Sequence, residues 1–452
     1  MEKRGGTKLE TWISSLSESR FVTIVILGYM ALFLAVSPLF PGVSWFQLGD
    51  FTLPVVNYYH TIMIPFALML IILVGSMLKV YPRIMKIVNY SAYLVLLFSI
   101  LGLFFFYPSW SVTADEVFQS IRDVIVVFDA FLVIVSLMVI PLRDSSQFKK
   151  IWGAYILILT AGISAEIAGI MGMFLEYGTL FGFSSIGFMS TFVNSVGGSD
   201  TFLANLLGSH SHQMLPAVMG SIIAIAAVVF RYEKLTSRWR WLVNVGLLVS
   251  IFGTISMSYV YWVSSFGTYQ IPGIFTSGPG GVNGLAFDDL LTGIVGVGGM
   301  IAIAGIYTAS RVSRESISLT ISELGTWVAA MFVMVGIGYL IEFNEAFYSG
   351  SGASYDSAFL NGHMLFTFFL ITVIAGVVVT IMHYGIHPRM SNYIASLVIA
   401  GTVIGSEGVL IYTMTLAYQV EAIGLILIVA ATIMAPIAMY MPRDHPVAKT
   451  AA

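Results

Sequence analysis

The 452-residue sequence contains no cysteine and very few charged residues. The absence of cysteine excludes disulfides, thiolate metal sites, iron–sulfur clusters and cysteine-linked haem of the c type. Charged residues make up only 10% of the chain, whereas they form about a quarter of an average soluble domain. The formal net charge of −3 gives no sign of a polyanionic partner such as nucleic acid. Together these shortages exclude an ordinary soluble fold.

Apolar residues, in contrast, fill 58% of the chain, and the mean hydropathy is +0.92. A bilayer core about 30 Å thick needs roughly 20 apolar residues per helix. Runs of that kind predict twelve spanning helices, near 21–40, 58–78, 87–107, 124–142, 151–175, 211–230, 241–263, 289–309, 321–342, 361–384, 392–416 and 420–441. We therefore expect an all-α, polytopic membrane protein with one transmembrane domain, residues 1–452.

Lysine and arginine indicate how these helices are oriented. All 20 of these residues except Arg122 fall on one side of the predicted membrane, and cytoplasmic loops are enriched in them. This pattern predicts both termini in the cytoplasm and a location in the plasma membrane. Residues 1–20 lack a small-residue cleavage site after the next apolar run, so we interpret them as a cytoplasmic lead-in, with 442–452 as a cytoplasmic tail.

The predicted outer side carries two long segments rich in glycine, serine and aromatic residues, Glu176–Asp200 and Ser264–Asp289. Connections of that length are uncommon unless they have a function. Two interpretations stay open: a cap folded over the outer face, or a landing surface for a partner subunit.

The seven histidines form two groups. His60, His212 and His363 recur at nearly equal intervals, four predicted helices apart, and His210 lies beside His212. This period predicts three units of four helices, each with a histidine near the outer end of its second helix. The other histidines lie at cytoplasmic helix ends, where we interpret them as interfacial residues: His383, His387 and His445.

A histidine at the membrane edge is either an interfacial amphiphile or a ligand, and its repetition at equivalent depth favours a ligand. Haem iron takes axial ligands from facing helices, and neutral imidazole is a favoured one. An apolar bundle also suits the porphyrin faces, with the propionates directed to the aqueous edge.

This pattern resembles subunit I of the haem-copper oxidase superfamily. His60 opens the run His-Thr-Ile-Met-Ile-Pro, and His363 stands in Asn-Gly-His-Met-Leu-Phe. The two positions match the axial ligands of the low-spin haem of that family. The resemblance implies one b-type haem with His60 and His363 on the iron, and His212 and His210 as a second haem's ligands or a quinone contact.

Other motifs of the family are missing. Asn361 replaces the high-spin haem ligand, His210-Ser-His212 stands where a His-Pro-Glu-type copper motif is expected, and Tyr259–Trp262 carries no histidine. The arginine pair that contacts the haem propionates is absent from Ala417–Ala422. The resemblance therefore implies a degenerate member without copper, an electron-transfer subunit of an oxidoreductase rather than a complete oxidase.

The arrangement also resembles the hydrophobic partner subunit of the glycosylated cytochrome b of archaeal respiratory chains. This resemblance implies a subunit that passes electrons between a quinol or an external cytochrome and a partner. An extracytoplasmic cytochrome or another respiratory subunit is then expected on the outer face.

Twelve spans also suit a proton-coupled secondary transporter. Asp129, Glu166 and Glu407 lie inside predicted spans that hold no basic residue, which is where functional carboxyls are expected. Three interpretations stay open: acids that brace helix contacts, a proton path that serves redox chemistry, or the coupling site of a transporter. The four-helix period and the histidines at the outer face favour the redox class. The sequence indicates no catalytic nucleophile.

Overall fold

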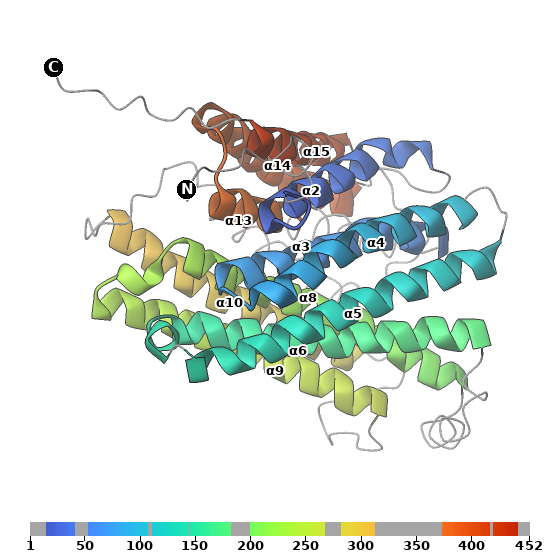
Figure 1. Ribbon diagram of the computed structural model, residues 1–452, viewed down its shortest axis with the longest axis horizontal. Coiled ribbons are helices and arrows are strands. Elements are labelled where there is room, and N and C mark those ends of the chain that lie inside the picture. The colour runs from blue at the N-terminus through green and yellow to red at the C-terminus, as the bar shows by residue number, and fades with distance from the viewer. Residues whose placement is uncertain are drawn as a thin grey trace, which may run out of the picture.

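The computed structural model describes residues 15–40, 53–106, 111–143, 145–181, 199–266, 282–311, 373–415 and 419–441. Within these ranges every regular element is helical. The α-helices are α2 (Ser19–Val36), α3 (Leu53–Met77), α4 (Pro82–Phe106), α5 (Val112–Arg143), α6 (Ser145–Phe181), α8 (Ser199–Val229), α9 (Ser237–Phe266), α10 (Val282–Arg311), α13 (Ile374–Tyr384), α14 (Pro388–Thr415) and α15 (Gln419–Tyr440). Long helices lie side by side along the molecule (Figure 1).

Among the described residues, eight helical segments are long and apolar enough to cross a membrane: Ser19–Leu39, Asn57–Met77, Pro82–Phe106, Thr113–Leu142, Phe148–Glu176, Ser237–Tyr259, Gly293–Ser310 and Gln419–Tyr440. Each lies at a predicted span. Shorter apolar helices, Pro216–Val229, Ile374–Tyr384 and Met390–Gly405, lie at three more, and the predicted span 321–342 falls outside the described residues. The all-α, multi-pass membrane architecture is confirmed, and the number twelve stays a prediction.

Several helices extend beyond the apolar runs that predicted them. Helix α6 continues to Phe181 and α8 begins at Ser199, while α9 continues to Phe266 and α10 begins at Val282. The segments 176–200 and 264–289 are therefore partly helical, contrary to the expectation of long loops. An apolar run detects only the part of a helix at hydrocarbon depth, so its polar ends are missed.

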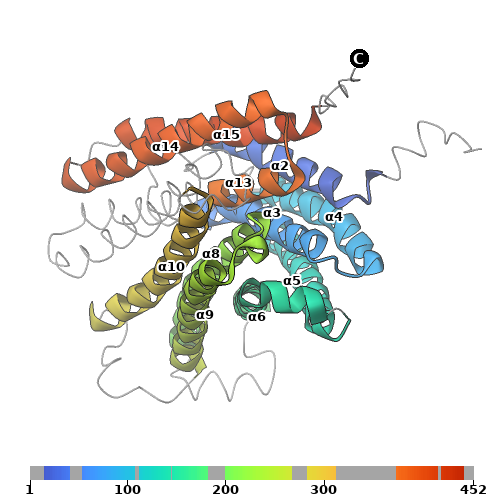
Figure 2. The same cartoon turned by 90° about the vertical axis from the view of Figure 1, so that its left-hand side faces the viewer.

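Helix α3 lies at the centre of the described part. It packs against α2, α4, α5, α8 and α13, and its buried side chains include Tyr58, Ile62 and Phe66, all fully inaccessible. The last described helix, α15, packs against the first, α2. The Arg20 guanidinium donates from Nη2 to the Met439 carbonyl at 2.7 Å. Figure 2 shows α14 and α15 together beside α2.

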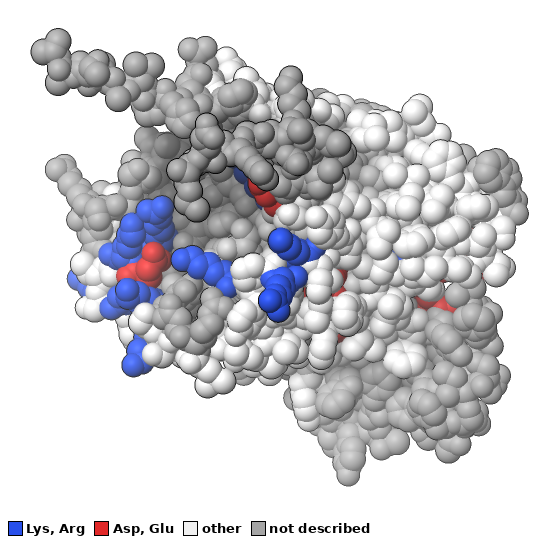
Figure 3. All heavy atoms as spheres, viewed as in Figure 1, with Lys and Arg blue, Asp and Glu red and all other residues white. Residues whose placement is uncertain are grey.

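The outside of the bundle is apolar, as expected for a surface in contact with lipid. Large hydrophobic side chains are exposed along the outward faces of the helices, among them Leu94, Phe104, Phe128, Phe131, Phe252 and Ile255. In the face shown in Figure 3, lysine and arginine gather toward the left and centre, and the right-hand end displays mostly uncharged atoms. The apolar helices thus suggest a lipid bilayer as the environment of this protein.

Glycine allows α9 and α10 to pack closely against each other. An ideal Cβ added to Gly298 on α10 would lie 2.5 Å from the Gly246 carbonyl oxygen, and one added to Gly246 on α9 would lie 2.5 Å from the Gly298 oxygen. Small residues let helix backbones approach in membranes, where packing rather than hydrophobicity drives helix association.

Replacing Gly298 with valine should therefore force α9 and α10 apart. We expect a loss of about 1–3 kcal/mol, the usual cost of overpacking, seen as a lower unfolding temperature in detergent. Gly28→Ala is the matched control, because a Cβ there meets nothing within 4 Å. Equal stability of Gly298→Val and Gly28→Ala would contradict this packing.

Candidate functional site

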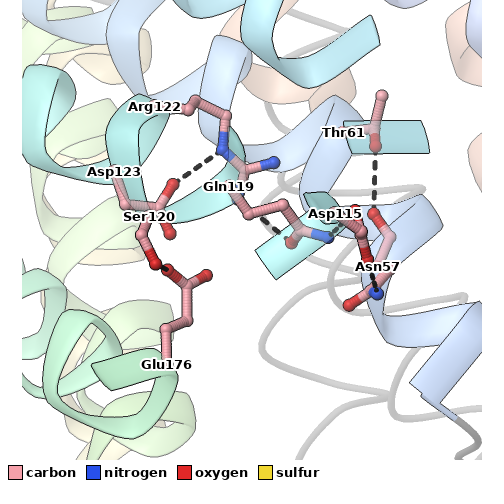
Figure 4. A network of polar contacts seen from close by, with 8 residues as sticks. All are labelled: Asn57, Thr61, Asp115, Gln119, Ser120, Arg122, Asp123 and Glu176. Atoms are coloured by element: carbon pink, nitrogen blue, oxygen red, sulfur yellow. Dashed lines mark hydrogen bonds and ion pairs between the residues drawn. The ribbon is translucent and has the colours of Figure 1, made fainter. Parts of the chain in front are cut away.

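A buried polar network joins α3, α5 and α6 (Figure 4). Its first part surrounds Asp115, which is fully buried near the beginning of α5. Asn57 Nδ2 donates to one carboxyl oxygen of Asp115 at 2.8 Å, and Gln119 Nε2 donates to the other at 2.6 Å. Helix α4 approaches α5 closely here: a Cβ added to Gly102 on α4 would lie only 3.0 Å from Asp115 Oδ1. Both oxygens of this buried carboxyl group thus have hydrogen-bond donors.

Arg122 is the central residue of the network and is only 1% exposed. Its Nε donates to Asp123 Oδ1 at 2.7 Å, and its Nη2 makes a long contact of 3.5 Å with Gln119 Oε1. Its Nη1 is buried and has no hydrogen-bond partner. A buried charge must be paired to be tolerated, so the ion pair with Asp123 is what allows the guanidinium to stay inside the helix bundle.

Helix α6 contributes one more carboxyl group. Ser120 on α5 donates from Oγ to Glu176 Oε2 at 2.9 Å. The Glu176 carboxyl also lies within electrostatic range of Asp123 and Arg122. Asp123 therefore lies between a guanidinium on its own helix and a second carboxyl group on the neighbouring helix (Figure 4).

Two histidines lie beside this network. The rings of His60 on α3 and His210 on α8 have centroids 6.2 Å apart, with planes inclined by 66°. His210 Nδ1 lies 2.7 Å from the Ala168 carbonyl oxygen. A carbonyl oxygen only accepts, so Nδ1 carries the hydrogen, and in neutral His210 the lone pair is on Nε2. Gly172 leaves room for the ring, because a Cβ there would lie 2.8 Å from His210 Cε1.

The structure thus brings together two of the four predicted ligand histidines, His60 and His210. His212 lies on α8, and its side chain is outside the described part, as is the whole of His363. The pairing of His60 with His363 stays a prediction, and the histidine found next to His60 is His210. Because α8 begins at Ser199 and α3 at Leu53, these histidines lie inside their helices rather than at the openings.

The three predicted intramembrane carboxyls have different surroundings. Asp129 is fully buried and is hydrogen-bonded to Ser91 through one oxygen, while its Oδ1 has no partner. Glu166 Oε2 is likewise buried without a partner. Glu407 is exposed on the surface of α14. Within the described ranges, no hydrogen bond connects these three residues.

The network around Arg122 was not predicted from the sequence, which indicated Arg122 only as an exception to the charge pattern. The predicted span began at 124, so residues 112–123 were placed in a connection. A signal was present: Asp115, Gln119 and Arg122 are spaced i, i+4, i+7 and so share one face of a helix.

Comparison with known proteins gives no relative: no family model, no curated protein and no solved structure matches the chain.

The residues present can be compared with the needs of a haem iron. In the described part, no group of three or more histidines and carboxylates is arranged to hold a metal ion. Two imidazoles from facing helices do lie together, and His210 is held through Nδ1 by a backbone carbonyl, as metal-binding histidines commonly are. The donor chemistry therefore fits axial ligation of a haem.

The ion pair gives a direct stability prediction. Asp123→Leu leaves the Arg122 charge buried and unpaired, so we expect a loss of about 3 kcal/mol, measured as a lower unfolding temperature or a lower midpoint of chemical unfolding. The double variant Arg122→Leu/Asp123→Leu should recover much of that loss because no charge is left uncompensated. Glu116→Gln, one helical turn from Ser120 and outside the network, is the control. A single variant as stable as Glu116→Gln would contradict the role given to the pair.

Proposed function

We propose that this protein is the membrane subunit of a respiratory electron-transfer complex and binds a low-spin b-type haem through His60. The observation that carries the proposal is the packing of His60 against His210, two imidazoles supplied by different helices in an apolar bundle. Neutral imidazole is a common axial ligand, and two facing helices are the usual source of such a pair.

In this proposal His60 is one axial ligand, and His210 or His363 is the other. Bound haem supplies reversible one-electron chemistry at iron. His210 offers Nε2 because Ala168 fixes the hydrogen on Nδ1. The guanidinium of Arg122, which lies within electrostatic range of His60, places one fixed positive charge beside the ligand.

Electrons would pass between a quinol or an external cytochrome and a partner subunit, as the two sequence resemblances imply. The histidines and the Arg122 network lie nearer one end of each of α3, α5, α6 and α8. We propose that this end faces the outer side of the plasma membrane, because the remaining lysines and arginines fall at the predicted cytoplasmic side. An extracytoplasmic cytochrome could then dock there.

Haem binding is tested on protein purified in detergent, by the reduced-minus-oxidised spectrum and a pyridine haemochrome assay. We expect a sharp low-spin b-type signal, with loss of that signal in His60→Ala because an axial ligand is gone. His383→Ala serves as the matched control, since it removes a histidine remote from the proposed ligands and should retain the haem.

The second ligand is identified in the same assay. Loss of haem in His210→Ala but not in His363→Ala would assign the pair seen in the structure, and the reverse would assign the pair indicated by the sequence. A properly folded protein that contains no haem would rule out the proposal.

Orientation is tested with single cysteines, which are unique labels because the chain has none of its own. Thr113 at the start of α5 and Lys86 on α4 are both exposed. With a membrane-impermeant maleimide, we expect Thr113→Cys to react in intact cells and Lys86→Cys to react only after the cells are opened. The opposite result would invert the proposed topology.

A proton-coupled transporter is the second candidate, favoured by the unpartnered carboxyl oxygens of Asp129 and Glu166. Carboxyl groups inside membrane helices without a charged partner are typical of coupling sites. Glu407, exposed on α14, gives less support. A haem-free protein would make Asp129 and Glu166 the first residues to examine in a transport assay.

A further inference from the structure

Basic residues gather where the beginning of α6 meets the connection between α8 and α9. We call them the basic cluster: Lys149, Lys150, Arg231, Lys234, Arg238 and Arg240. Two contacts join these segments: Ala154 N of α6 donates to Tyr232 Oη at 3.4 Å, and a Cβ added to Gly153 would lie 2.4 Å from Asn244 Oδ1 of α9. Figure 1 shows both segments toward the left-hand end of the bundle, and Figure 3, in the same view, shows lysine and arginine gathered toward that end.

The basic cluster has far more positive than negative charge. Glu233 is the only acidic residue in 145–160 and 228–245. Five of the basic side chains are exposed, and Arg240 is half-buried. Within the described ranges, no ion pair joins any of them to a carboxylate. The protein therefore leaves this group of cations without counterions, although the whole chain has a formal net charge of −3.

The basic cluster lies at the depth of the lipid headgroups. The apolar segments of α6 and α9 begin at Phe148 and Ser237, and the apolar part of α8 ends at Val229. Each cation of the cluster lies a few residues from one of these boundaries. Hydrocarbon ends where the apolar segments end, and lysine and arginine near helix ends extend their charges to the interface. Trp241 on α9 is 67% exposed, and tryptophan is enriched at this same depth.

Phosphate is the group that best suits such a cluster. The guanidinium of arginine matches the oxygens of a phosphate, and lysine adds a compact positive charge. Phospholipid phosphates surround a membrane protein at this depth, whereas inorganic phosphate would have to come from the aqueous phase. A zwitterionic headgroup brings a cation of its own, so an anionic phospholipid gains more from the positive charge of the cluster.

The backbone at Arg231 provides a way to remove one cation without damage to the fold. Arg231 has φ 56° and ψ 43°, a left-handed conformation that favours glycine. Lys79, in the connection between α3 and α4, has the same φ of 56°. Glycine at either position relieves the backbone and removes one positive charge, so the two substitutions form a matched pair.

We propose that the basic cluster binds the headgroup of an anionic phospholipid in the leaflet that this end of the bundle occupies. The arginines donate hydrogen bonds to phosphate oxygens, and the lysines add positive charge from both segments. The cations that lack counterions within the described part of the chain are thereby neutralised by lipid. This binding is non-covalent, needs no haem and goes beyond the proposed function.

Native mass spectrometry of the purified protein tests the proposal, with phosphatidylglycerol and phosphatidylcholine of the same acyl chains added in turn. We expect the wild-type protein to retain phosphatidylglycerol in preference to phosphatidylcholine. Arg231→Gly should bind phosphatidylglycerol about five-fold more weakly, and Lys149→Gln/Lys150→Gln about 25-fold more weakly, from the usual contribution of each cation at a membrane surface. The control Lys79→Gly should bind it as the wild-type protein does. The unfolding temperature of Arg231→Gly should be no lower than that of the wild-type protein, because the backbone strain is relieved.

Three results would overturn the proposal. Equal binding of the two lipids would show that the cluster does not select negative charge, and an equal loss in Lys79→Gly and Arg231→Gly would show only a diffuse effect of net charge. Displacement of phosphatidylglycerol by an equal concentration of inorganic phosphate would assign the cluster to free phosphate instead of lipid. A haem-free protein that retains phosphatidylglycerol selectively would reject the proposed function and support this binding site.

Discussion

The burial of Arg122 is the constraint on which this end of the structure depends. A guanidinium that is 1% exposed inside an apolar bundle is costly unless it is paired and hydrogen-bonded. Asp123 supplies the pairing charge and Gln119 a weaker contact, and Gln119 in turn donates to Asp115. Asn57 of α3 also donates to Asp115. The hydrogen bonds that extend from Arg122 therefore connect α5 to α3. Each of these hydrogen bonds alone contributes little to stability. Together they matter more, because the loss of any one of them would leave a buried charge unsatisfied in hydrocarbon.

The same constraint positions the histidines. Helix α3 carries both Asn57 and His60, one on each side of Tyr58 and Tyr59, so the bond from Asn57 to Asp115 sets the depth at which His60 lies. Helix α8 is fixed from the other side, where His210 bonds to the Ala168 carbonyl of α6 and fits against Gly172. Two imidazoles on separate helices therefore meet because each helix is held by its own polar contact. Apolar packing alone would leave the helices freer to slide or rotate.

The sequence predicted the helices well and the site only in part. Runs of apolar residues locate spans because hydrocarbon demands them, so every predicted span in the described ranges has a helix. His60 was predicted as a ligand from its repetition with His212 and His363, and His210 was predicted beside His212 as a second haem's ligand or a quinone contact. That His60 would meet His210 was not predictable, since spacing along the chain does not say which helices become neighbours. The Arg122 network was missed for a different reason: residues 112–123 are too polar to count as a span, although their i, i+4, i+7 spacing is helical.

The distribution of polar groups in the bundle bears on the class of protein. A secondary transporter needs its coupling groups near midplane and accessible in turn from both sides. Here the hydrogen-bonded charges are concentrated around Arg122, next to the histidine pair, while Asp129 and Glu166 lie apart from one another without a shared hydrogen bond. A cluster hydrogen-bonded by Asn57, Gln119 and Ser120 suits a cofactor held in one place. It suits poorly a site that must open alternately to the two sides. These fixed hydrogen bonds are our reason for proposing electron transfer ahead of transport.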